Sequence, residues 1–138
     1  MYELDRFVKA HEKSYETALA EIKKGRKTSH WMWYIFPQLK GFGSSDTAQF
    51  YGLKNLAEAQ AFLDHPVLGQ HLREITAELL LVKTNNATEV FGKPDDMKLL
   101  SCMTLFASVD NTAEVFQKVL DTFFGGRKDP RTLEFIGT

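Results

Sequence analysis

Both tryptophans of the chain, a tyrosine, a phenylalanine and a histidine lie within nine consecutive residues, from His30 to Gln38. Aromatic side chains bury large areas, and Trp and Tyr also carry a polar group that needs a partner. This run is therefore either the centre of the core or the wall of a pocket. Core packing is the commoner role of such aromatic stripes. In the alternative, Trp31 or Trp33 forms a wall, and His30 and Gln38 supply polar groups at the two ends.

Two basic clusters could supply the charge that binds an anion. In the first, residues 26–30, basic side chains and His30 surround Ser29, a residue type that begins helices, and free N–H groups at a helix start bind anions. In the second, Arg127 and Arg131 flank the start of the last expected helix, after two glycines that allow close backbone approach. The alternative is that these are ordinary helix-end cations that stabilise helix dipoles.

A third group of polar residues follows the motif Phe91-Gly92. On a helix, Asp95, Lys98 and Ser101 are neighbours at three-residue spacing. An Asp–Lys surface pair explains this spacing most simply. A catalytic Ser–Lys pair is disfavoured, because the Ser-x-x-Lys signature runs in the opposite order. We take Lys98, with Gln38 and Tyr51, as a candidate for orienting a bound anion.

The histidines and the single cysteine do not form a metal-ligand pattern. His65 and His71 are six residues apart, off a common helical face, and no His-Glu-x-x-His spacing occurs. Cys102 lies in the most apolar expected helix, so we expect a buried, unreactive thiol. Gly41-Phe42-Gly43 lacks the third glycine of a nucleotide-binding loop. The sequence therefore predicts no metal and no cofactor.

The composition is that of an ordinary globular protein. Of 138 residues, 43% are hydrophobic and 25% are charged, and the net charge of −1 argues against nucleic acid as a partner. The longest uncharged run, residues 28–39, is far shorter than the roughly 18–20 apolar residues that span a membrane. The first residues are acidic where a signal peptide is basic, and one cysteine excludes an intrachain disulfide. We expect a cytoplasmic protein without a membrane partner.

Apolar residues at three- and four-residue spacing predict helices along the chain. The expected helices cover residues 5–24, 56–64, 66–82, 88–92, 94–108, 112–124 and 130–135, and two further short stretches, one ending near residue 35 and one at 47–53, can also form a helix. Ser45 or Asp46, Asn55 and Asn111 are the expected N-terminal caps. No segment alternates with a period of two. The sequence thus predicts an all-α fold: a single compact helical domain, residues 1–138, with about six to eight helices and no significant sheet.

Three long blocks of the sequence carry a resemblance to a known family. They are His30-Trp31-Met32-Trp33 with Phe36-Pro37-Gln38, then Phe91-Gly92-x-Pro94-Asp95-Asp96-x-Lys98-Leu99-x-Ser101-x-Met103-Thr104-Leu105-Phe106, and Phe123-Phe124-Gly125-Gly126-Arg127-x-Asp129-x-Arg131-Thr132. With Arg6-Phe7 and residues 47–51, they resemble the bacterial family named domain of unknown function 1810, over nearly the whole chain. The resemblance implies a small, mainly helical stand-alone protein and no particular activity. The chain departs from the family pattern at His11, where we expect glutamine; if that position lines the site, ligand preference or pH response would differ.

No motif is specific for a reaction, so the sequence does not decide whether the protein is an enzyme. It does not determine the oligomeric state either. The first hypothesis is an enzyme or small-molecule-binding domain for an anionic ligand of the nucleotide or sugar-phosphate type. The second is a non-catalytic protein-interaction or structural module with an exposed aromatic patch. The first requires His30 and Arg127 to face one concave surface. Its candidate residues are His30, Trp31, Trp33, Gln38, Tyr51, Lys98, Arg127 and Arg131.

Overall fold

The computed structural model describes residues 3–109 and 114–137. It contains the helices α1 (Asp5–Lys23), α2 (Met32–Ile35), α3 (Asp46–Tyr51), α4 (Leu56–Asp64), α5 (Leu68–Leu79), α6 (Ala87–Phe91), α7 (Asp95–Val109), α8 (Glu114–Phe124) and α9 (Pro130–Ile136). Within these residues the only β feature is an isolated bridge between Leu39 and Leu53. The all-α prediction is therefore confirmed. The expected caps Ser45 and Asn55 accept hydrogen bonds from the first turns of α3 and α4, whereas the expected cap Asn111 lies outside the described residues.

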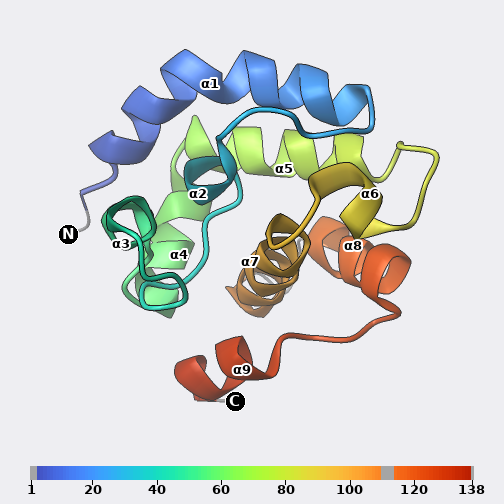
Figure 1. Cartoon of the computed structure of the whole chain (residues 1–138). Helices are drawn as coiled ribbons and strands as arrows, with labels where there is room; N and C mark the ends of the chain where they lie inside the picture. Colours follow the sequence, from blue (N-terminus) through green and yellow to red (C-terminus); the bar gives the residue numbers. More distant parts are fainter. Residues whose placement is uncertain (1–2, 110–113, 138) are drawn as a thin grey trace.

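Helix α7 occupies the centre of the structure. It contacts α4, α6, α8 and α9, while α1 runs along one side and packs on α5 (Figure 1). Because neighbours surround α7, residues 99–106 are all buried. A helix that is enclosed in this way is apolar on most sides, and in residues 99–106 the only polar side chains are Ser101 and Thr104, which face α9 through Asp129.

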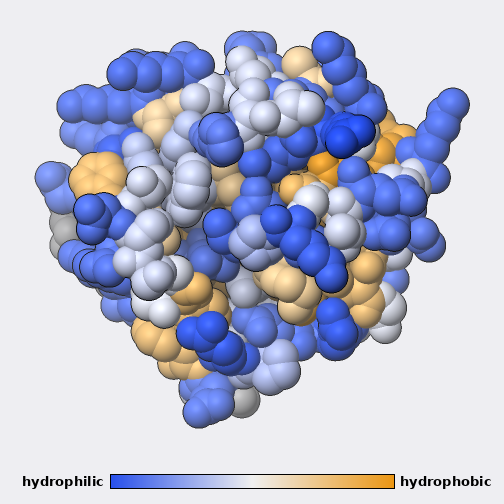
Figure 2. All heavy atoms as spheres, in the orientation of Figure 1, coloured by the Kyte–Doolittle hydropathy of each residue, from blue (hydrophilic) through white to orange (hydrophobic). Residues whose placement is uncertain are grey.

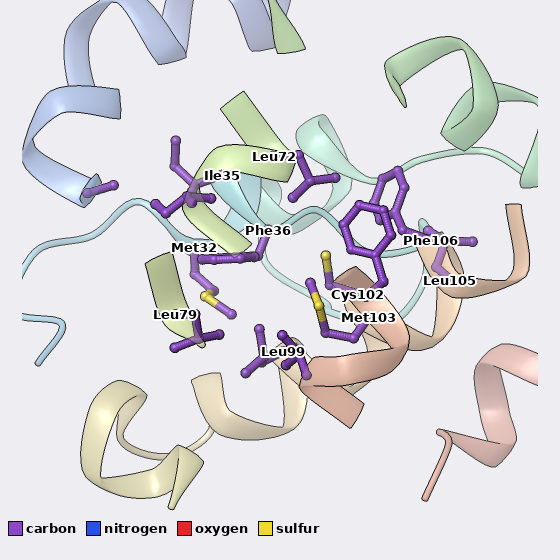
Figure 3. Close-up of a cluster of buried hydrophobic side chains, with 14 of the residues drawn as sticks. Met32, Ile35, Phe36, Leu72, Leu79, Leu99, Cys102, Met103, Leu105 and Phe106 are labelled. Carbon is purple, nitrogen blue, oxygen red and sulfur yellow. The ribbon is translucent and has the colours of Figure 1, made fainter. Parts of the chain in front are cut away.

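The short helix α2 supplies one side of the core. Its buried side chains meet those of α5 and α7 in one apolar cluster, which Figure 3 shows. The labelled members are Met32, Ile35, Phe36, Leu72, Leu79, Leu99, Cys102, Met103, Leu105 and Phe106. The thiol of Cys102 is fully buried, and this burial raises its pKa well above the ordinary value. The expected inert cysteine is thus found in the core.

A buried carboxylate fixes the start of the aromatic run. Glu21, near the end of α1, accepts hydrogen bonds from the backbone N–H groups of Thr28 (2.8 Å) and Ser29 (3.0 Å) and from the Ser29 hydroxyl. It also accepts one from the indole N–H of Trp31 at 2.9 Å. The expectation that free backbone N–H groups in residues 26–30 bind an external anion is therefore wrong, because those of Thr28 and Ser29 bind Glu21. Ser29 does not cap a helix, because its donors already bind the protein's own anion, and α2 begins at Met32.

These hydrogen bonds also determine the charge of Glu21. Burial alone would raise the pKa of the carboxyl, but the bonds from Ser29, Thr28 and Trp31 outweigh burial and lower the pKa to about 2. Glu21 is thus ionised at neutral pH. The stability that it contributes is complete above pH 4.5, the ordinary value, and is lost as the pH falls toward 2.

Helix α9 is attached to α7 through Asp129. The Asp129 carboxylate accepts hydrogen bonds from the hydroxyls of Ser101 (2.8 Å) and Thr132 (2.6 Å), and its backbone N–H donates to the Thr104 hydroxyl (2.9 Å). Thr132 and Thr104 are buried. This network fixes the position of Arg131, which lies in the first turn of α9.

The outer surface is mainly polar. On the face in Figure 2, apolar side chains form separate patches among polar ones. The large apolar side chains that are exposed come from different segments: Phe50, Val67, Leu81, Met97 and Phe135. In the part of the chain that the structure describes, no helix has the length and hydropathy needed to cross a membrane.

We expect Glu21→Gln to lower the free energy of unfolding by roughly 2–3 kcal/mol, because an amide loses the charge-assisted bonds and directs its NH2 group at donors. Chemical denaturation at pH 7 measures this change. Glu12→Gln, on the exposed face of the same helix, is the matched control and should change stability by less than about 0.5 kcal/mol. Equal effects of the two substitutions would contradict the assignment.

Candidate ligand-binding site

Four of the predicted site residues line one small pocket. Trp33 follows the core residue Met32 in α2, Gln38 lies in the segment after it, Tyr51 ends α3, and Lys98 comes from the first turn of α7. The remaining lining residues are Met32, Phe36, Ala48 and Gly52. Three separate segments of the chain therefore bring these side chains together.

The bridge next to α3 holds two of these segments side by side. The backbone N–H of Leu53 donates to the carbonyl of Gln38 (3.0 Å), and that of Lys40 donates to the carbonyl of Leu53 (2.7 Å). A Cβ at Gly52 would lie 2.5 Å from the Cα of Lys40, so this close approach requires glycine. Sequence reasoning missed Gly52 and Ala48, because a role that depends on backbone approach leaves no local pattern.

Two lysines share one carboxylate beside the pocket. Asp95 lies 2.9 Å from the ammonium of Lys27 and 3.3 Å from that of Lys98, which confirms the expected Asp–Lys pair at three-residue spacing. The Lys98 ammonium also lies 5.2 Å from the centre of the Trp33 ring, and the Lys27 ammonium lies 5.1 Å from that of Trp31. One carboxylate does not neutralise two cations, so this group keeps a positive charge that can attract an anion.

Three polar groups around the pocket have no hydrogen-bond partner among the residues of the described ranges. They are the indole N–H of Trp33, the side-chain amide of Gln38 and the hydroxyl of Tyr51. All three side chains are half-buried. Burial raises the pKa of the Tyr51 hydroxyl, and the nearby Tyr34 adds to the effect while Arg6 opposes it, so the hydroxyl stays a proton donor at neutral pH. The pocket thus presents donors and an acceptor that the protein itself does not use.

The pocket is small, and a contact between Gly43 and Ala48 separates it from a larger hollow. The free volume of the pocket is about 10 Å³, enough for one small group or one water molecule. A Cβ at Gly43 would lie 2.7 Å from the Cβ of Ala48, and beyond this contact lies an open hollow of about 620 Å³. That hollow is lined by Lys40, Gly41, Phe42, Gly43, Ser44, Gln49 and Arg131. The Arg131 guanidinium lies 4.4 Å from the centre of the Phe42 ring.

The structure does not bring the other predicted residues to this pocket. Trp31 is 1% exposed and its N–H is bonded to Glu21. The prediction that Trp31 stacks on a ligand is therefore wrong, because its ring belongs to the core. His30 is exposed and lines neither hollow. Arg127 lines a separate hollow of about 370 Å³, together with Thr88 and Asp96. The expected convergence of His30 and Arg127 on one surface is therefore not observed.

The Ser101 hydroxyl belongs to the network that attaches α9 to α7. It donates to Asp129, whereas Lys98 is directed toward Asp95 and Trp33. The disfavoured Ser–Lys pair is thus absent from the described structure. In the described parts of the chain no three His, Cys, Asp or Glu side chains are grouped closely enough to hold a metal ion.

His11 lies away from the pocket, in the contact between α1 and α5. Its Nε2 lies 2.8 Å from the carbonyl oxygen of Tyr34, and its Nδ1 lies 2.9 Å from Nδ1 of His71. Because a carbonyl can only accept, Nε2 of His11 carries the proton, and its bare Nδ1 accepts from the Nδ1–H of His71. The rings of Tyr15 and His71 stack with centres 3.6 Å apart, and the Tyr15 hydroxyl donates to Glu74.

This environment disfavours the protonated form of His11. Burial is the main cause that lowers the pKa of His11 to about 4; the Tyr34 carbonyl opposes it, and His71 and His65 add to it. Burial also lowers the pKa of His71, against the opposing charges of Glu74 and Glu16. The folded protein binds a proton at His11 less readily than the unfolded chain does. Its contribution to stability is therefore complete above pH 6.5 and is lost as the pH falls from 6.5 to 4.

From this we expect the free energy of unfolding to fall by roughly 2 kcal/mol between pH 7 and pH 5 because of His11 alone. In His11→Gln an amide can donate to Tyr34 and accept from His71 without titrating, so the loss should be smaller by that amount. Denaturation curves at both pH values test this. His30→Gln, at an exposed histidine, should keep the wild-type slope; a wild-type slope in His11→Gln would overturn the explanation.

Comparisons with known proteins identify the family. The comparison with curated proteins finds no match. Among solved structures, the chain is similar to the conserved hypothetical protein Rv1873 from Mycobacterium tuberculosis, with 44% sequence identity and a TM-score of 0.95. The alignment covers 98% of this chain and 96% of that chain. The family model described as a protein of unknown function, DUF1810, matches residues 1–136. The chain therefore belongs to the DUF1810 family.

Proposed function

We propose that the protein binds a small anionic ligand, of the nucleotide or sugar-phosphate type, at the pocket lined by Trp33, Gln38, Tyr51 and Lys98. The observation that carries this proposal is the unused hydrogen-bonding capacity of three half-buried side chains around one pocket. These polar atoms reach solvent, since the buried polar atom without a partner in the described residues is the Thr76 hydroxyl, so a ligand would replace water at them. A polar ligand would satisfy them.

The charge next to the pocket supports an anion as the ligand. Lys98 has a carboxylate partner that it shares with Lys27, so its ammonium keeps capacity for a second anion. The small pocket accepts a single group, such as one phosphate oxygen, and a larger hollow lies on the other side of the contact between Gly43 and Ala48. Arg131 lines that hollow and supplies a second cation. Trp33 supplies an apolar wall for the group that enters the small pocket.

The alternative, a protein-interaction module with an exposed aromatic patch, has less support. Trp31 is buried and Trp33 and Tyr34 are half-buried, so the aromatic run offers no broad exposed surface. Interface centres are rich in exposed aromatic side chains that become buried on binding. Small-molecule sites, in contrast, combine apolar walls with a few convergent polar groups, which is the composition of this pocket.

We propose that the protein is cytoplasmic and binds this ligand there. The support is the single cysteine, Cys102, which is buried in the core as a free thiol. A chain that stabilises itself by core packing, without disulfides, suits a reducing compartment.

We expect AMP to stabilise the wild-type protein in a thermal-shift titration and Lys98→Met to weaken AMP binding by at least about tenfold, because a charge-assisted contact is lost. Methionine keeps the apolar stem of the lysine, so the fold should be unaffected. Calorimetric titration gives the two dissociation constants. Ribose 5-phosphate and adenosine, titrated in parallel, separate recognition of the phosphate from recognition of the base.

Lys118→Met is the matched control, since Lys118 is an exposed lysine of α8 outside the pocket. It should bind AMP as the wild type does. Absence of binding by both AMP and ribose 5-phosphate, or an equal loss in the two variants, would refute the proposal.

A further inference from the structure

A further hollow, which shares Tyr51 with the pocket at Lys98, lies against α1. Its free volume is about 240 Å³. It is lined by Arg6, Lys9, Ala10, Lys13, Ser14, Tyr34, Phe50 and Tyr51. Three of these side chains are cationic and none is acidic. The cations lie three to seven residues apart on α1, which places them on one face of the helix.

Arg6 has a structural role in this hollow. Its guanidinium donates to the carbonyl oxygens of Phe50 (2.8 Å), Gly52 (3.4 Å) and Glu3, and it forms an ion pair with the buried carboxylate of Glu58 at 3.4 Å. These contacts hold the end of α3 against α1. Arg6 thus builds the wall, and its charge is already compensated by Glu58.

Lys9 and Lys13 are the uncompensated cations. Neither ammonium forms an ion pair or hydrogen bond with any residue that the structure describes. Three carboxylates lie at helical spacing from these lysines on the same helix: Asp5 four residues before Lys9, Glu12 three after Lys9, and Glu16 three after Lys13. None of the three is paired with its lysine. The hollow therefore has a positive charge of two that no carboxylate of its lining neutralises.

Aromatic side chains form the opposite wall. Phe50 is 59% exposed and its ring meets that of Tyr51 edge-on, with centres 4.8 Å apart. Tyr34 and Tyr51 also contact each other, with centres 5.0 Å apart. Arg6 binds the carbonyl of Phe50 and so holds the backbone that carries this exposed ring. An exposed phenylalanine in the same lining as two cations suits a ligand that has both an apolar ring and an anionic group.

We infer that this hollow is a second binding site, which takes an organic phosphate with a flat or aromatic body. Lys9 and Lys13 bind the phosphate. The Tyr34 hydroxyl donates to the carbonyl of His30 (3.1 Å) and lies 3.1 Å from the Ser14 hydroxyl, so these two groups hold each other in the wall and the ammonium groups are the donors. Phe50 and Tyr51 contact the ring. The site has different cations from the pocket at Lys98, although Tyr51 lines both.

Phenyl phosphate is the probe that tests this site, because it combines one ring with one phosphate. In calorimetric titrations of the full chain at low salt, we expect the double variant Lys9→Met/Lys13→Met to bind it at least about tenfold more weakly than the wild type does. Phe50→Ala should weaken phenyl phosphate and leave the weaker binding of inorganic phosphate unchanged. Wild-type affinity for phenyl phosphate in Phe50→Ala would overturn the aromatic part of the site.

The double variant Lys23→Met/Lys24→Met is the matched control, since it removes the same charge from the other end of α1. It should bind phenyl phosphate as the wild type does. Lys98→Met reports any binding of the probe at the other pocket, because Lys98 lines only that pocket. No binding of phenyl phosphate by the wild type, or a loss in the control equal to that in Lys9→Met/Lys13→Met, would overturn the inference. If the loss occurs only in Lys98→Met, the probe binds the first pocket and the second site is refuted.

Discussion

The hydrogen bonds to the Glu21 carboxylate determine which residues of the aromatic run face the core. They hold the backbone of residues 28–29 at the end of α1 and direct the Trp31 ring inward. From that fixed point α2 begins, and its short turn places Met32 and Ile35 inside and leaves Trp33 half-buried at the edge. The segment after α2 then reaches the bridge at Leu39, which sets the position of Gln38. One buried acid thus connects the packing of α1, the core and the candidate pocket.

The protein's own carboxylates occupy two of the places that looked suited to an external anion. Glu21 binds the backbone donors ahead of α2, and Asp129 binds the hydroxyls near the start of α9. What remains for a ligand is the charge that internal acids do not neutralise. Lys98 shares Asp95 with Lys27, and the two lysines on the outer face of α1 have no acidic partner in the described structure. The pocket at Lys98 and the hollow at Lys9 and Lys13 therefore both lie where helices present excess positive charge beside aromatic rings.

Local patterns explain why the helices could be predicted. Apolar spacing and caps act within one turn, and the expected helix at residues 56–64 has the observed bounds and the observed cap, Asn55. The division of the run between Trp31 and Trp33 could not be predicted, because it depends on Glu21, ten residues before Trp31. The sequence marked four residues as candidates for their chemistry, but it did not show that they come together: Trp33, Gln38, Tyr51 and Lys98. Lys9 and Lys13 were missed, since cations on the polar face of an amphipathic helix are the usual pattern.

The division of the aromatic run can be measured directly, because the chain contains only two tryptophans. Trp33→Phe leaves Trp31 as the sole indole, and Trp31→Phe leaves Trp33. Quenching of their fluorescence by acrylamide, a neutral molecule, reports how far solvent reaches each ring. The structure predicts weak quenching and blue-shifted emission from Trp31, and several-fold stronger quenching of Trp33, which AMP should reduce. Equal quenching of the two rings, or stronger quenching of Trp31, would contradict the account.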